Sequence, residues 1–407
     1  GLSRPVPPCL QHVLTIGNFD DVHRVHQALF QRLVALKHQL HRPALAVTFD
    51  PSPLAVLRPD LVIEPLTTMP QRLELLGRLH LDNVLVLCSN PRLLELSAHE
   101  FWHHLLIEQL QIQGIVEGAN FHFGKHRQGR VQELQRWSAE AGIPCTIVED
   151  VFLEEGPPPG IHISSSLIRQ CLQAGDILQA NRALGRAYSL TGYIVEGEKR
   201  GRTLGFPTAN LADIPTLLPR EGVYAGRTRI LDQNYAVALH IGPNPTFGVQ
   251  QRKIEAHLPD YSGQLYGSTL TLELEQRVRD IRKFDSVDDL RAQLANDLAE
   301  VRRLIPPTSS LLTSTSRTTP SMTTPGTTST LQERVAQAFT TALQPEMQAA
   351  GLELLLGGVD ADGVVTVHLE GACQSCPSTA MALIMGIERR LIELVPEVAY
   401  LEVTPKR

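Results

Sequence analysis

The stretch VLTIGNFDDVHRVHQALFQRLVALKHQL (residues 13–40) joins an apolar run to a polar turn and then to an amphipathic segment. The run at 13–19 is typical of a buried strand, and leucines recur along 26–40 with the period of a helix. A strand that leads directly into a helix is the building unit of α/β domains. Similar apolar runs follow at residues 44–49, 83–88 and 114–118. The pattern predicts a doubly wound parallel sheet within residues 1–184.

The rest of the chain divides by composition. From about residue 186, short β-rich runs separated by glycine and proline predict an antiparallel barrel. An amphipathic helix at 286–304 follows, so this domain is expected to span residues 185–305. Residues 306–330 consist mostly of Ser, Thr, Pro and Gly, with one charge at Arg317, and are expected to be a disordered linker. Residues 331–407, where acidic side chains outnumber basic ones, form a further domain.

Composition limits the function classes. The 407 residues include 43% hydrophobic and 20% charged residues, and the net charge of −6 argues against general binding to nucleic acid or anionic membranes. No apolar run reaches the ~18 residues of a membrane span, and Pro5, Pro7 and Pro8 interrupt the start where a secretory leader would need an apolar core. We therefore expect a cytoplasmic protein, in which Cys9, Cys88, Cys145 and Cys171 stay reduced.

The turn after the first strand is a candidate phosphate site. It reads Gly17-Asn18-Phe19-Asp20, and His23 and His26 follow at the start of the helix. Free backbone amides and the helix dipole favour anions at such a turn. Histidines three residues apart share one helical face, although a His-x-x-His pair alone is more often structural or solvated.

Three more stretches agree with the phosphate site in order: TFDP (48–51), GANFHFGK (118–125) and ISSSLIR (163–169). Together they resemble the nucleotidyltransferases with an H-x-G-H motif, specifically the prokaryotic bifunctional riboflavin kinase/FMN adenylyltransferases. The resemblance implies that Ser166 and Arg169 bind the ATP triphosphate, that Asn120 lies along the flavin pocket, and that His23 and His26 are catalytic. The implied reaction is attack of the FMN phosphate on the α-phosphorus of ATP, with release of pyrophosphate.

Two residues depart from that family. Asp21 and Val25 stand where the family has glycine. Glycine admits close approach of phosphate to the backbone, whereas Asp21 adds negative charge and Val25 adds bulk. We therefore expect slowed adenylyl transfer.

The barrel contains a second candidate site at GYIVEGEKRGRTLGFPTAN (192–210). Its glycine-rich, basic loop could wrap a polyphosphate; the residues concerned are Lys199, Gly201, Arg202 and Gly205. Thr208 and Asn210 are two apart on an extended segment, so they face one side and offer hard oxygen ligands for Mg²⁺. A loop of this kind alone is usually a solvated hairpin.

With P-T-A-N attached, this segment closely resembles the ATP–Mg²⁺ site of riboflavin kinases. Downstream stretches agree, including HIGPNPTF (240–247) and KIEAHL (253–258). The resemblance implies that Glu255 is the base for the riboflavin 5′-hydroxyl and that Arg279 and Phe284 contact the flavin. Ile281 departs from the glutamate that the family commonly has there.

The C-terminal segment contains the only close cysteine pair, Cys373 and Cys376. A Cys-x-x-Cys loop supports a redox dithiol, half a zinc site or half an iron–sulfur site, or has no metal role. It follows a predicted hairpin (352–371), which suits thioredoxin chemistry poorly, and only His368 is nearby as a further zinc ligand. GACQSCPS (371–378) and MGIERRL (385–391) resemble NifU-type scaffold domains. That resemblance implies a [4Fe–4S] cluster shared by two subunits, each giving two thiolates.

The sequence thus predicts a multidomain α/β plus β protein: a Rossmann-like nucleotidyltransferase sheet, an antiparallel riboflavin-kinase barrel and a small α+β NifU-like domain. The expected function is FMN and FAD synthesis from riboflavin and ATP–Mg²⁺, with delivery of iron–sulfur clusters to apo client proteins and a possible cluster-bridged homodimer. Two alternatives stay open: a kinase that makes FMN only, and a chain that acts chiefly as an iron–sulfur carrier.

Overall fold

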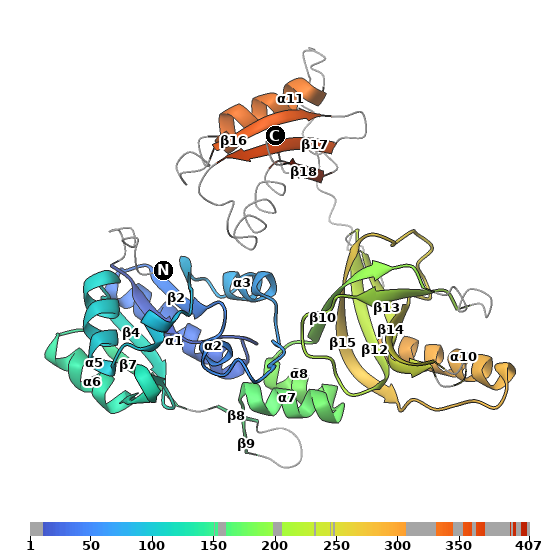
Figure 1. The fold of residues 1–407 in the computed structure, drawn as a ribbon, viewed down its shortest axis with the longest axis horizontal. Coiled ribbons are helices and arrows are strands. Elements are labelled where there is room, and N and C mark those ends of the chain that lie inside the picture. Colours follow the sequence, from blue (N-terminus) through green and yellow to red (C-terminus); the bar gives the residue numbers. More distant parts are fainter. Residues whose placement is uncertain are drawn as a thin grey trace, which may run out of the picture. The chain divides into compact units, whose positions relative to one another are not determined.

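The computed structural model contains two compact units, residues 1–310 and 311–407, which are described separately (Figure 1). The described residues are 11–149, 151–153, 160–197, 206–231, 233–244, 246, 249–306, 331–344, 353–359, 364–370, 391, 394–395 and 400–404. The predicted linker lies outside them, apart from residue 306.

The first unit begins with a five-stranded sheet of order β3-β2-β1-β4-β7, in which every pairing is parallel. The strands are β1 (Val13–Ile16), β2 (Ala44–Phe49), β3 (Asn83–Leu87), β4 (Gly114–Gly118) and β7 (Cys145–Val148). The predicted parallel sheet is confirmed, with β7 added. From β1 the chain proceeds to β2 and β3 on one side and later to β4 and β7 on the other. This reversal makes the ends of β1 and β4 the topological switch point, where open α/β sheets bind ligands.

Both faces of the sheet are buried because successive strand residues point to opposite sides. Leu14 and Ile16 pack with Trp102 in one apolar cluster, while Val13 packs with Phe30 in another. Helix α1 (Arg24–Leu40) covers the second face and begins after His23, whose Nδ1 accepts a hydrogen bond from the His26 amide at 3.3 Å. The expected helix at 26–40 therefore starts two residues earlier.

Short helices and strands complete this part of the unit. The helices are α2 (Pro53–Leu57), α3 (Met69–Gly77), α4 (Pro91–Leu94), α5 (Ala98–Glu100), the π-helical η1 (Phe101–Gln109), the 3₁₀ turn η2 (Lys125–Arg127) and α6 (Val131–Glu140). The short strands form two antiparallel pairs: β5 (His122–Phe123) with β6 (Gly129–Arg130), and β8 (Phe152–Leu153) with β9 (Ile161–His162).

Helices α7 (Ser165–Ala174) and α8 (Ile177–Leu184) follow and share one apolar core with the barrel. Ile168, Leu172 and Leu184 are fully buried there. The Asn181 side chain connects α8 to the barrel, since its amide nitrogen donates to the Leu274 carbonyl at 2.8 Å. The α/β part is thus packed against the barrel through these two helices.

The predicted antiparallel barrel is confirmed as a closed sheet of order β10-β11-β14-β13-β12-β15. Its strands are β10 (Tyr188–Val195), β11 (Thr208–Ala212), β12 (Gly222–Ile230), β13 (Gln233–Asn244), β14 (Val249–His257) and β15 (Thr269–Arg279). Leu190, Leu239 and Leu272 are fully buried in its interior. Helix α10 (Val287–Leu304) packs Val301 against Ala225 of β12, and Ser286 caps its first turn.

The second unit has helix α11 (Leu331–Ala338), the π-helical segment η4 (Phe339–Leu343) and a sheet of order β16-β17-β18. Strands β16 (Glu353–Val359) and β17 (Val364–Glu370) pair antiparallel, which confirms the expected hairpin. Strand β18 (Tyr400–Thr404) adds in parallel to β17. Within the described ranges of both units, no helix is long and apolar enough to cross a membrane.

Candidate active sites

The phosphate-site turn leaves the end of β1 at the switch point. Gly17 is required there, because a Cβ atom at this position would lie 2.7 Å from the Phe19 ring. Phe19 itself is buried and has a φ of 44°, while Asn18 is exposed and its carbonyl accepts a hydrogen bond from the Thr48 hydroxyl at 3.0 Å. The first strand therefore ends at Ile16, before the turn that the sequence run to residue 19 included.

Asp20 is the centre of a buried ionic network. Its carboxylate accepts from the backbone amides of Leu66 and Thr67, and the guanidinium groups of Arg72 and Arg169 donate to it at 3.0 and 2.8 Å. The guanidinium of Arg169 on α7 thus reaches the turn where the sequence places the phosphates, and there it is already paired with the Asp20 carboxylate. Ser166 is exposed on the first turn of α7.

Arg72 was not predicted as part of this site. It lies 52 residues from Asp20, and a lone arginine on an amphipathic helix gives no signal of such a partner.

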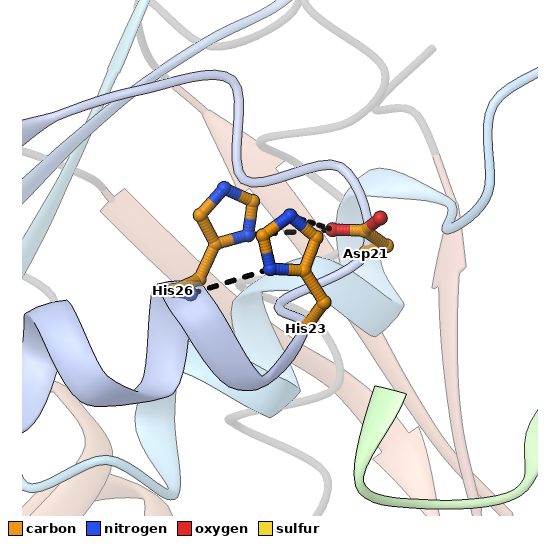
Figure 2. A group of neighbouring side chains, drawn as sticks. All are labelled: Asp21, His23 and His26. Atoms are coloured by element: carbon orange, nitrogen blue, oxygen red, sulfur yellow. Dashed lines mark hydrogen bonds and ion pairs between the residues drawn. The ribbon is translucent and has the colours of Figure 1, made fainter. Parts of the chain in front are cut away.

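Asp21, His23 and His26 form a second cluster beside this network (Figure 2). The two imidazole rings stack with centroids 3.7 Å apart, and His26 Nδ1 lies 3.3 Å from Asp21 Oδ1. Burial and the neighbouring His26 lower the pKa of His23 to about 4, so this ring is neutral at neutral pH. Because Nδ1 of His23 accepts the His26 amide, the neutral ring carries its proton on Nε2.

Arg186 fixes the backbone of this turn from the segment between α8 and β10. Its guanidinium donates to the carbonyl oxygens of Asp21 at 2.7 Å and Val22 at 3.4 Å. Gln27 also donates to the Val22 carbonyl, at 2.9 Å. These contacts hold Val22 at a φ of 45°, which a β-branched residue rarely adopts. No motif in the sequence indicates the Arg186 contact.

Asn120 lies in the loop that follows β4, across the switch point from the β1 turn. Its carbonyl oxygen is 2.8 Å from Nδ1 of His122. The loops after the neighbouring strands β1 and β4 thus leave the same edge of the sheet, one carrying the phosphate-site turn and the other Asn120.

In the barrel, Asn210 of β11 is directly opposite Glu255 of β14, and Glu255 is directly opposite His240 of β13. Residues opposite each other in adjacent strands point to the same face, so the three side chains form a row. This face is the outer one, because Leu239 and Ala256 alternate with the row and are buried in the interior.

Asn244, which sequence reasoning did not assign, extends the row: its Nδ2 is 3.4 Å from Glu255 Oε2. Thr208 is two residues before Asn210 and shares its face. Thr208, Asn210 and Glu255 therefore offer a hydroxyl, an amide and a carboxylate oxygen on neighbouring strands, and this donor set fits Mg²⁺. Gly197 packs against the Asn210 amide, where any Cβ atom would collide with it. Lys199, Gly201, Arg202 and Gly205 lie outside the described residues.

Arg279 and Phe284 come together at the end of β15. The Arg279 guanidinium carbon is 5.8 Å from the Phe284 ring centroid, a cation–π arrangement. The same guanidinium forms a bidentate pair with Asp297 of α10, at 2.8 and 2.6 Å. Asp297 is buried and was missed from the sequence, since an acidic residue on a charged helix is expected to face solvent. Ile281 packs over Gly242 of β13.

Cys373 and Cys376 lie outside the described residues, so the structure does not place the predicted cluster ligands.

Family models match three successive parts of the chain. They are FAD synthetase over residues 9–166, riboflavin kinase over 184–305, and the NifU-like domain over 335–402.

Curated relatives match the first two of these parts together. The bifunctional riboflavin kinase/FMN adenylyltransferase of Escherichia coli K12 is 34% identical over 286 residues, which are 70% of this chain and 90% of that protein. The protein of the same name from Pseudomonas fluorescens is 35% identical, covering 72% of this chain and 93% of the relative.

A crystal structure described as a macrolide-efflux protein from Streptococcus pneumoniae superposes with a TM-score of 0.65. It is 30% identical and covers 73% of this chain and 95% of its own.

The α/β switch-point site and the oxygen-lined barrel site define a two-site nucleotide-dependent enzyme. At this identity and coverage, the chain belongs to the family of bifunctional riboflavin kinase/FMN adenylyltransferases and carries a NifU-like domain at its C-terminus.

Proposed function

We propose that this protein phosphorylates riboflavin to FMN in the barrel and adenylylates FMN to FAD at the switch-point site, using ATP in both steps. The observation that carries the proposal is the row of Asn210, Glu255 and His240 across three adjacent barrel strands. It brings a carboxylate beside the oxygen donors of the Thr208–Asn210 segment. Family membership supports the same pair of reactions.

In the kinase step, Glu255 accepts the proton of the riboflavin 5′-hydroxyl while that oxygen attacks the γ-phosphorus of ATP. The bond to the β-phosphate oxygen breaks, and ADP leaves. A primary alcohol is a weak nucleophile, so a carboxylate within hydrogen-bond reach contributes about 10²–10⁴-fold. Asn244, 3.4 Å from Glu255, orients the carboxylate. Thr208 and Asn210 would hold Mg²⁺, which supplies charge neutralisation on the phosphates when bound.

In the adenylyl step, a phosphate oxygen of FMN attacks the α-phosphorus of ATP and pyrophosphate leaves. The residues contribute positioning and charge stabilisation, with no covalent intermediate. The neutral His23 donates one hydrogen bond from Nε2, and Arg169 offers its guanidinium from α7. The Gly17–Asp20 turn supplies backbone amides to the anion, and Ser166 supplies a hydroxyl. We assign the flavin contacts to Asn120 here and to Arg279 and Phe284 in the barrel.

For the whole chain we propose an adenylyltransferase domain at 1–184, a kinase domain at 185–305, a linker at 306–330 and an iron–sulfur domain at 331–407. The first boundary falls between the end of α8 at Leu184 and the start of β10 at Tyr188. The family model for FAD synthetase ends before this boundary, at residue 166, and the model for riboflavin kinase begins at its first residue, 184.

We further propose that Cys373 and Cys376 of two copies bind one [4Fe–4S] cluster for transfer to apo iron–sulfur proteins. Thiolates are the ligands that iron–sulfur clusters prefer, and one copy supplies only two at this motif. Anaerobic reconstitution of the full chain should give a brown dimer. A colourless monomer would contradict the assignment.

Chromatography of the products from riboflavin and ATP–Mg²⁺ tests the enzyme assignment. FMN and FAD together are expected. FMN alone would indicate that only the kinase site works, and no product would leave iron–sulfur transfer as the main role. Asp21 and Val25 replace the family's glycines in the adenylyl site, so the amount of FAD is the decisive result of this assay.

A further inference from the structure

Two adjacent carboxylates in the β1–α1 turn have different surroundings. Asp20 receives hydrogen bonds from two arginines and two backbone amides. Asp21 is 0% exposed, yet neither of its carboxylate oxygens has a hydrogen bond of acceptable geometry among the described residues. Nδ1 of His26 is also buried without a hydrogen bond in this part of the chain. A buried charge without well-formed hydrogen bonds is costly, so a cation bound beside Asp21 would stabilise this turn.

The three side chains bring one possible ligand atom each close together. The two imidazole planes are only 8° apart, so one ring must turn before both nitrogen lone pairs point at one ion. Asp21 Oδ1 is 3.3 Å from His26 Nδ1 and 3.9 Å from His23 Nε2, and one ligand atom from each residue lies within 4.8 Å of the other two (Figure 2). Ligands about 2.0–2.1 Å from a tetrahedral zinc ion lie roughly 3.3 Å from one another. The distance from Asp21 Oδ1 to His26 Nδ1 already has this value. The distance from Asp21 Oδ1 to His23 Nε2 must shorten by about half an ångström.

We propose that Asp21, His23 and His26 form a binding site for one divalent transition-metal ion of the zinc class. Two imidazoles and a carboxylate are a common three-ligand set for zinc, and three protein ligands leave a fourth position open. The donor set does not favour Mg²⁺, which prefers oxygen ligands and octahedral geometry. The site depends on Asp21, the residue that departs from the family's glycine.

Each imidazole would bind the ion through an unprotonated ring nitrogen. A metal on His23 Nε2 moves the ring proton to Nδ1, so in the metal-bound protein the ion takes the place of the Nε2–H donor of the proposed adenylyl step. The 3.3 Å contact from the His26 amide to Nδ1 is then given up.

The arginines near the cluster direct their hydrogen bonds away from the Asp21 carboxylate, although Arg186 interacts with it electrostatically. Arg186 faces the turn, but its guanidinium donates to the carbonyl oxygens of Asp21 and Val22. Arg72 and Arg169 are paired with Asp20. A bound divalent ion would reverse the charge that Asp21 brings, so the turn would again attract a phosphate oxygen, with the open position to receive it.

Titration of the full chain with Co²⁺, followed by visible absorption, tests the proposal. Cys373→Ser and Cys376→Ser are introduced into every protein, because the thiolates would otherwise bind the same ion. We expect one equivalent bound with the d–d bands of a nitrogen- and oxygen-ligated site. Asp21→Asn and Asp21→Gly should weaken Co²⁺ binding about tenfold or more. Loss of a residue that only supports a metal ligand already lowers metal affinity about tenfold, and Asp21 would be a ligand itself.

The matched control is His104→Gln, which removes an exposed histidine 2.8 Å from a carboxylate in the same part of the unit. It should leave binding unchanged. Circular dichroism and melting temperature check that each variant folds. Absence of Co²⁺ binding in the parent, or equal affinity in the folded Asp21 variants, overturns the proposal. The result is independent of FAD formation, so failure of the proposed adenylyl transfer is measured separately.

Discussion

Asn210 and Glu255 are directly opposite each other on β11 and β14, with their side chains on the outer face of the barrel. The 44 residues between them include two of the six barrel strands, β12 and β13, and only closure of the barrel makes β11 and β14 neighbours. Because of this pairing, the Thr208–Asn210 segment, which suits magnesium, and Glu255 can act on the same phosphate group.

Replacing Glu255 with glutamine should lower the turnover number for FMN formation by about 10²–10⁴-fold, because the amide cannot accept the hydroxyl proton. Affinity for ATP should change little. Initial rates with riboflavin and ATP–Mg²⁺ measure both quantities. Glu273→Gln, an exposed position on β15, is the control and should behave as the parent. A Glu255→Gln enzyme within about twofold of the parent would exclude a proton-accepting role.

Arg169→Ala should lower kcat/KM for FAD formation about ten- to hundredfold, the effect of losing a hydrogen bond to a charged group. FMN formation in the same protein should be unaffected, since the barrel residues are unchanged. Stability should also be largely kept, because Asp20 retains Arg72 and two backbone amides. Assays started from FMN separate the two activities, and Arg136→Ala on the exposed face of α6 is the control. Equal loss of both activities would point to a folding defect instead.

Much of this arrangement could be predicted from local patterns. The runs at 44–49 and 114–118 coincide with β2 and β4 because both are mostly apolar and buried on both faces. The barrel strands were likewise indicated by their short, glycine-separated runs. These features depend on neighbours in sequence.

The ionic contacts could not be predicted in the same way. Asp20 meets Arg169 after 149 residues, and Arg186 reaches the Asp21 carbonyl after 165. Nothing at these positions distinguishes a buried arginine from a solvated one until the helices are packed. The His-x-x-His motif predicted where the two histidines lie, but it could not predict that the Asp21 carboxylate beside them is buried.

Restoring glycine at Asp21 and Val25 together should raise the rate of FAD formation with Mg²⁺ as the only added divalent ion. The change removes a negative charge and a branched side chain where phosphate must approach the backbone. FMN adenylylation by the parent and the double variant is compared at equal protein concentration. Leu178→Ala, an exposed side chain on α8, serves as control. Equal rates in parent and double variant would show that these two substitutions do not limit the reaction.

Asp297→Ala should destabilise the barrel by about 3–5 kcal/mol, because Arg279 would lose its buried partner. Asp297 is 3% exposed and Arg279 is largely buried, so solvent compensates little. Since Arg279 would no longer be held beside Phe284, the KM for riboflavin should rise more than the KM for ATP. The urea dependence of FMN formation reports stability, and Glu300→Ala, a surface pair on the same helix, is the comparison. If stability and activity fell while the KM for riboflavin stayed the same, Asp297 would have a structural role only.

Glu117→Gln should remove a pH-dependent loss of stability in the α/β part. Glu117 of β4 is buried beside β1, and burial raises its pKa well above the usual range, although the Ile16 amide donates to it at 2.7 Å. The folded state therefore keeps a proton that the unfolded chain releases near pH 4.3, so stability falls as pH rises from there to the folded pKa, by about 1.4 kcal/mol per pH unit. The glutamine variant lacks this slope and should gain stability relative to the parent as pH increases.

Urea unfolding followed by tryptophan fluorescence measures this stability, because both tryptophans of the chain, Trp102 and Trp137, lie in the α/β part. Glu140→Gln on exposed α6 controls for surface charge, and parallel stability–pH curves for the parent and Glu117→Gln would show that Glu117 is ionised in the fold.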